Sequence, residues 1–113
     1  MDKFKVQFLK EAIEFLDKIE EKARAKIIYN ITKAKTINDK ELFKKLTGEI
    51  WEFRTLYNKK QYRLFAFWDK TEKPESIVIS THGLIKTTSK ITKSDLDRAE
   101  SLRKEYFKLK IYK

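Results

Sequence analysis

The sequence predicts an α+β fold in which an antiparallel sheet of about four strands packs on N-terminal helices, with a further helix at the C-terminus. Three observations support this prediction. Apolar residues at helical spacing fill the first third of the chain. Consecutive runs rich in aromatic and β-branched residues occupy the middle. A final amphipathic segment begins near Thr92. Helices that precede and follow a group of consecutive strands are typical of this fold class.

The N-terminal part is expected to form one strand and then helix. Apolar and polar residues alternate over Phe4–Phe8, which indicates a short strand. From Leu9 the apolar spacing becomes helical and continues to Ala34 without Gly or Pro. One long helix and two helices joined near residues 20–22 both fit this pattern. A helix of more than about 25 residues would be long for this chain, which favours the helical hairpin.

A short helix is expected next, because Asn38 or Asp39 can cap its beginning and Gly48 can end it. Its apolar side chains would be those of Leu42, Phe43 and Leu46.

The remaining elements are three strands and a helix. Residues 58–60 suit a hairpin connection, and residues 69–75, which hold the only Pro, form a polar loop. Thr92 and Asp95 resemble a capping box. The expected strands are Glu49–Leu56, Gln61–Trp68 and Ser76–His82. The expected buried side of the last helix consists of Leu96, Ala99, Leu102 and Tyr106.

Alternation along the three strands divides their side chains into two sets. The nearly all-apolar set should face the helices and consists of Trp51, Phe53, Tyr62, Leu64, Ala66, Trp68, Ile77 and Ile79. The other set should be exposed and consists of Ile50, Glu52, Arg54, Arg63, Phe65, Phe67, Val78, Ser80 and His82. Exposed rings between arginines suit RNA, because bases stack on rings and guanidinium groups bind phosphates. The structural alternative is that Glu52 merely pairs with Arg54 and that Phe65 and Phe67 belong to the core.

Composition limits the possible functions. A chain of 113 residues has the length of one domain, 1–113. It carries 27 Lys and Arg against 17 Asp and Glu, a net charge of +10. This charge attracts nucleic acid, an anionic membrane surface or an acidic protein, although a basic surface can also serve solubility alone. The absence of Cys excludes disulfides and thiol catalysis, and a single His argues against a zinc site, so we expect no metal or cofactor. Without a signal or membrane-spanning segment, the protein is expected in the cytoplasm and away from membranes.

Three segments together resemble a known family. They are residues 46–54 (LTGEIWEFR), 62–65 (YRLF) and 82–90 (HGLIKTTSK). Their order and spacing are similar to those of the phage-derived, HigB-like branch of the RelE/ParE toxin superfamily, over most of the chain from Phe4 through Tyr106. The third segment departs from the family pattern, because Leu84 stands where Phe is usual, Thr87 replaces a Lys, and residues 91–92 replace Thr-Pro.

The resemblance implies a microbial-RNase-like fold that acts on messenger RNA, usually on the ribosome. It also implies a helix-turn-helix antitoxin as partner, with DNA reached only through the antitoxin complex. By motif position, Arg54, Arg63 and Lys86 would bind the scissile phosphate, with His82 beside them as a further catalytic residue. Glu52 or His82 is a candidate base, and Glu52 is better explained as holding Arg54 in place. The side chains expected to contact RNA around this centre are those of Lys59, Lys60, Phe65, Phe67 and Lys90.

Two other functions fit parts of the sequence. One is a ParE-like inhibitor that binds DNA gyrase, and the other is a non-catalytic RNA-binding module. The combination of Arg54, Arg63, Lys86 and His82 favours a metal-independent endoribonuclease, since a gyrase-binding protein needs no convergent cationic cleft. Thr87 is the feature that most favours the non-catalytic module.

Overall fold

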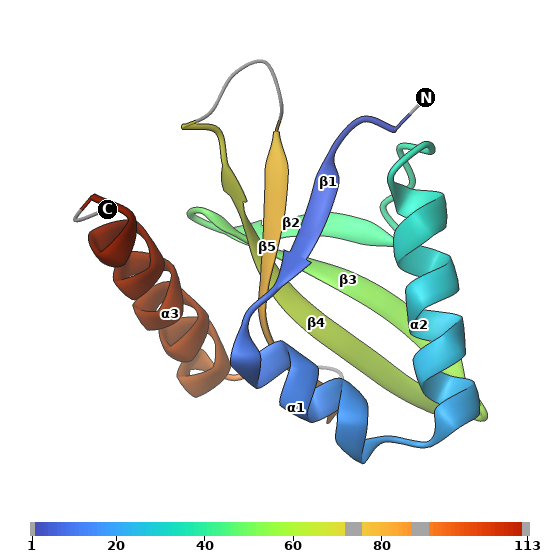
Figure 1. Cartoon of the computed structure of the whole chain (residues 1–113). Coiled ribbons are helices and arrows are strands. Elements are labelled where there is room, and N and C mark those ends of the chain that lie inside the picture. The colour runs from blue at the N-terminus through green and yellow to red at the C-terminus, as the bar shows by residue number, and fades with distance from the viewer. Residues whose placement is uncertain (1, 72–75, 87–90, 112–113) are drawn as a thin grey trace.

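The computed structural model describes residues 2–71, 76–86 and 91–111. One five-stranded sheet has the strand order β1-β5-β4-β3-β2. Helices α1 and α2 lie on one side of this sheet and α3 lies on the other (Figure 1). The architecture confirms the predicted α+β class. The elements are β1 (Lys5–Phe8), α1 (Lys10–Lys18), α2 (Glu21–Ala34), β2 (Phe43–Thr47), β3 (Ile50–Tyr57), β4 (Lys60–Asp69), β5 (Ile77–Lys86) and α3 (Lys93–Ile111).

The sheet is mixed rather than purely antiparallel. β1 pairs in parallel with β5, with Val6 opposite Val78, whereas the other three strand pairs are antiparallel. The helical hairpin favoured by the sequence is present, because α1 ends at Lys18 and α2 begins at Glu21. The β3–β4 connection is a two-residue turn, in which Asn58 and Lys59 both adopt positive φ. No described helix combines the length and the apolar character needed to cross a membrane.

The expected short helix over residues 42–46 is wrong, because this segment forms strand β2. Phe43 lies opposite Phe53 and joins the core beneath α1 and α2. Leu46 packs instead with the core on the α3 side. This short edge strand therefore contributes one apolar side chain to each face instead of alternating apolar and polar residues. Its apolar residues three positions apart then resemble a helical pattern.

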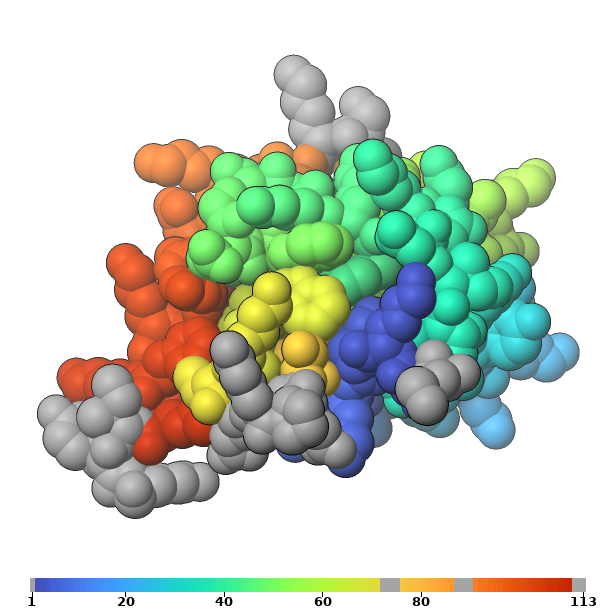
Figure 2. Space-filling model, turned by 90° about the horizontal axis from the view of Figure 1, so that it is seen from above, coloured from blue at the N-terminus to red at the C-terminus, as the bar shows by residue number. Residues whose placement is uncertain are grey.

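Helices cover both faces of the sheet, and two separate cores result. Figure 2, seen from above, shows the red atoms of α3 and the blue to teal atoms of α2 on opposite sides of the green and yellow atoms of the sheet. The core beneath α1 and α2 contains Phe53, Tyr62, Leu64 and Ala66, as predicted, but it takes Val78 from β5. Ile79 lies opposite Phe67 and buried Ser80 lies opposite Ala66, so the predicted faces of residues 77–80 are wrong. The core beneath α3 contains Ile50, Phe65 and Ala99, with Leu46, Leu84, Ile91 and Leu96 packed against them.

A β-bulge in β5 alters the alternation of this strand. Its pairing with β4 passes from Ser80–Ala66 to Gly83–Leu64, so that Thr81 and His82 lie opposite the single residue Phe65. The Ser80 and Thr81 hydroxyls both donate to the carbonyl oxygen of Phe65, at 3.3 Å each. The bulge places His82 against the Phe65 ring, with ring centroids 4.9 Å apart.

Gly83 follows the bulge at the point where α1 crosses β5. A Cβ atom at this position would overlap the ring of Phe15. The glycine of the His-Gly motif therefore permits close packing of α1 on the sheet.

Candidate nucleic-acid interface

The α3 face of the sheet carries a cluster of cations toward the β3–β4 turn. Arg54 on β3 lies directly opposite Arg63 on β4, so the two guanidinium groups share one face. One step further, Gln61 on β4 lies between Leu56 on β3 and Lys86 on β5. The register therefore brings together three predicted site residues, Arg54, Arg63 and Lys86.

Glu52 holds the two arginines side by side. Its Oε1 lies 3.1 Å from Arg63 Nε and its Oε2 lies 3.6 Å from Arg54 Nε. The side chains of Glu52 and Arg63 are each only 3% exposed, whereas that of Arg54 is 25% exposed. A buried carboxylate between two guanidinium groups fixes their positions, and the predicted supporting role of Glu52 agrees with this geometry.

Arg63 is the more deeply buried arginine. Its guanidinium donates to the carbonyl oxygen of Tyr62 at 3.2 Å and to Gln61 Oε1 at 2.8 Å. Burial lowers its pKa, while the charge of Glu52 acts in the opposite direction. The prediction that Arg63 is exposed is therefore wrong. Arg54 reaches solvent instead and lies 3.7 Å from the exposed carboxylate of Glu41.

A shallow pocket of about 150 Å³ lies over this cluster. Both arginines line it, together with Glu41, Thr55, Leu56 and Gln61. The side chain of Leu56 in this lining is 65% exposed. The sequence pattern places Leu56 on this face, because it lies two positions after Arg54 on the same strand and alternate residues share a face.

Lys86 belongs to the cluster electrostatically. Burial lowers its pKa most, and the positive charge of Arg63 lowers it next. Glu52 raises the pKa, and the charges of Arg54 and Lys44 lower it further. Lys44 is a charged neighbour that the sequence analysis did not select, because the segment around it was expected to be a helix.

His82 lies apart from these cations. It is 3% exposed, and it lies four positions before Lys86 on β5, a separation of roughly 13 Å along the strand. Burial, and next the charge of Arg98, lowers its pKa from the ordinary 6.5 to about 4. Its Nδ1 lies 3.2 Å from the Thr81 hydroxyl, and its buried Nε2 has no hydrogen-bond partner among the described residues. The structure therefore does not place His82 beside the arginines and Lys86.

Phe65 and Phe67 are not available for base stacking. Both rings are 0% exposed and lie beneath α3, where Phe67 contacts Tyr106 and Phe107. The prediction that these rings are exposed is wrong, and the core alternative for them is correct. Sequence alternation assigned them to the correct face but did not reveal that α3 covers it.

The remaining predicted RNA contacts lie at the margins. Lys59 stands in the β3–β4 turn and Lys60 begins β4, and both are exposed. Lys60 lies on the α2 face, opposite to that of Gln61, because neighbouring strand residues alternate. Lys90 lies outside the described residues.

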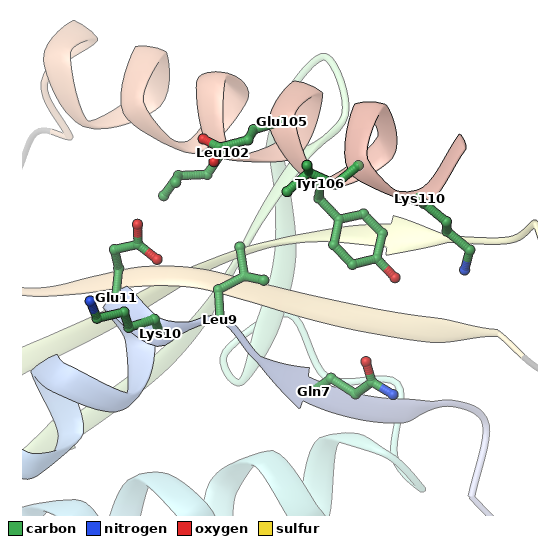
Figure 3. Close-up of a pocket in the computed structure, with 9 residues that line it drawn as sticks. Gln7, Leu9, Lys10, Glu11, Leu102, Glu105, Tyr106 and Lys110 are labelled. Carbon is green, nitrogen blue, oxygen red and sulfur yellow. The ribbon is translucent and has the colours of Figure 1, made fainter. Parts of the chain in front are cut away.

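A separate groove of about 1010 Å³ runs between α3 and the beginning of α1 (Figure 3). Leu9 and Leu102 face one another across it, and Tyr106 and Gln7 lie further along. Its charged lining residues balance in sign: Lys10, Glu11, Glu105 and Lys110. A balanced lining does not favour a polyanion. The cluster around Arg54 is therefore the better candidate site for nucleic acid.

The family comparison agrees with this geometry. Residues 14–104 match the model of a family described as "Phage derived protein Gp49-like (DUF891)". A comparison with curated proteins gives no match for this chain. The family match covers most of the sequence and includes β2 to β5, which carry all the clustered cations. The chain therefore belongs to the phage-derived Gp49-like family, a RelE/HigB-type toxin family of toxin–antitoxin systems.

Proposed function

We propose that this protein is the HigB-like toxin of a type II toxin–antitoxin pair and cleaves messenger RNA, on the ribosome, without a metal ion. The observation that carries the proposal is the pair of guanidinium groups fixed by buried Glu52, with Lys86 beside them. The cognate antitoxin, a helix-turn-helix protein, would neutralise it. Contact with DNA would occur only through the antitoxin complex. Its location in the cytoplasm stays a prediction.

RNA cleavage of this kind begins when the 2′-hydroxyl oxygen attacks the adjacent phosphorus and releases its proton to solvent water. The P–O bond to the 5′-oxygen then breaks, and the products are a 2′,3′-cyclic phosphate and a 5′-hydroxyl. Negative charge accumulates on the phosphorane oxygens, and preorganised cations stabilise that charge. Arg54 is the exposed fork that can bind two of those oxygens. Arg63 acts from beneath as a positioning residue that fixes Glu52 and Gln61.

Few groups near the cation cluster can take part in the proton transfers. Both carboxylate oxygens of Glu52 lie buried against arginines, so they do not face a bound substrate. His82 is sealed beneath α3. Lys86, with its lowered pKa, is the group best suited to donate a proton to the leaving 5′-oxygen. Charge stabilisation and positioning by the ribosome would then supply most of the rate enhancement.

Induced expression in bacteria tests this function. Cells expressing the wild-type chain should stop growing and accumulate new messenger RNA 5′ ends, while plasmid supercoiling stays unchanged. Cells expressing Arg54→Ala should keep growing and should accumulate no new messenger RNA 5′ ends. Altered supercoiling without new 5′ ends would favour the gyrase inhibitor. Growth arrest with neither change would favour the non-catalytic RNA-binding module.

A further inference from the structure

Lys44 occupies a defined place beside the cation cluster. It lies on β2 directly opposite Glu52 on β3, and directly opposite residues of paired strands share a face. Lys44 therefore stands on the same face as Arg54 and Arg63, and its side chain is half-buried.

The charge of Lys44 is not neutralised within the described part of the chain. Glu52, its cross-strand neighbour, makes its ion pairs with the two arginines. Lys44 forms no ion pair with any residue that the structure describes. Its charge nevertheless reaches the site, since it contributes to the lowered pKa of Lys86.

We infer that Lys44 is a phosphate-binding residue of this site, which contacts an RNA backbone phosphate next to the one at Arg54. The inference rests on the proposed RNA substrate. A single strand presents its phosphates in a row, and an unpaired ammonium group beside an arginine pair can take the next one along.

The alternative is a solvated lysine that protects an edge strand. β2 is the last strand of the sheet, and lysines are common on such edges because they prevent edge-to-edge pairing. Lys45 provides the matched control. It is adjacent in sequence, carries the same charge and points to the opposite face, where it lies across from Trp51.

The test compares Lys44→Ala with Lys45→Ala for binding to a short, fluorescein-labelled 2′-O-methyl RNA, which has no 2′-hydroxyl and cannot be cleaved. Anisotropy is measured over a range of salt concentrations. Lys44→Ala should weaken binding about fivefold at low salt and reduce the slope of log K against log salt by about 0.7, the value for one contact on a single strand. Lys45→Ala should leave the slope unchanged, and Lys44→Arg should restore it.

Equal slopes for the two alanine variants would overturn the inference, and so would a wild-type chain that does not bind this RNA. Lys44→Gln repeats the measurement with a longer side chain if the alanine variant folds poorly. Cleavage of ribosome-bound message is measured separately. A wild-type chain that binds through Lys44 but does not cleave contradicts the proposed enzyme and leaves the Lys44 inference standing.

Discussion

At the scale of single residues, the candidate site depends on one buried carboxylate. Glu52 has two arginines as partners, and only Arg54 reaches solvent. The sequence predicted this association, because Glu52 and Arg54 are two positions apart on one strand. It could not predict the burial of Arg63, which follows from cross-strand pairing and from neighbours distant in sequence. The ion pair and the binding site were treated as alternatives, yet in the structure the ion pairs of Glu52 position the two arginines on which the proposed site depends.

Arg63→Ala should destabilise the fold. The substitution leaves a carboxylate that is 3% exposed with a single arginine at 3.6 Å, so the free energy of unfolding should fall by about 3 kcal/mol. Arg54→Ala is the control, because its partly exposed pairs should contribute no more than about 1 kcal/mol. Urea unfolding of both variants measures the difference. Equal losses would contradict the buried position of Arg63.

His82 should make stability depend on pH. Its pKa is about 4 in the folded chain and about 6.5 when unfolded, so the unfolded chain binds more protons between these values. Stability is therefore complete above about pH 6.5 and falls as pH decreases, by about 2 kcal/mol between pH 7 and pH 5. His82→Gln removes this titration. If the wild type and this variant lose equal stability over that range, the assigned environment of His82 is incorrect.

At the scale of elements, the sequence predicted most strands and helices but not what covers them. Leu96 and Ala99 were correctly placed on the buried side of α3. Nothing in the pattern indicated that this side would cover Phe65 and Phe67 rather than leave them for RNA. The parallel pairing of β1 with β5 could not be predicted either, since it is set by the path of the chain through α1 and α2. Local periodicity reports which side of an element is apolar, whereas docking depends on contacts between distant segments.

Asp69 at the end of β4 anchors the C-terminal half of α3. It is 1% exposed and accepts hydrogen bonds from Tyr106 Oη at 2.6 Å and Lys110 Nζ at 2.7 Å, with further bonds from Thr71. Burial raises its pKa, but the bonds from Lys110, Thr71 and Tyr106 lower it more.

Asp69→Asn should therefore loosen this half of α3 and cost about 2–3 kcal/mol. Hydrogen exchange should quicken over residues 102–110 and stay unchanged in β3. Tyr106→Phe removes one bond and should cost about 1 kcal/mol. Unchanged exchange in α3 of Asp69→Asn would show that its attachment does not depend on this carboxylate.

At the scale of the whole molecule, a net charge of +10 favours association with polyanions, and we propose that RNA binds at the part of the α3 face that carries Arg54 and Lys86. Leu96 and Ala99 of α3 pack over Phe65, whereas the residues lining the pocket at Arg54 and Arg63 come from β3, β4 and Glu41. Buried apolar rings and the partly exposed Arg54 and Lys86 thus lie on one face, a few residues apart. The sequence did not indicate Lys44 because Phe43 and Leu46, three positions apart, pack on opposite faces of β2 and give this strand a helix-like spacing.

Substitution of Lys86 tests whether the cation cluster takes part in RNA cleavage or only binds RNA. Single-turnover cleavage of ribosome-bound message is compared with the Kd for a 2′-O-methyl RNA, for wild type, Lys86→Ala and Lys59→Ala. We predict that Lys86→Ala slows cleavage by on the order of 100-fold and weakens binding by less than about tenfold. Lys59→Ala, in the β3–β4 turn, should change binding and cleavage by the same small factor. If Lys86→Ala also reduces both by one common factor, Lys86 only anchors the RNA and its proposed part in cleavage is contradicted.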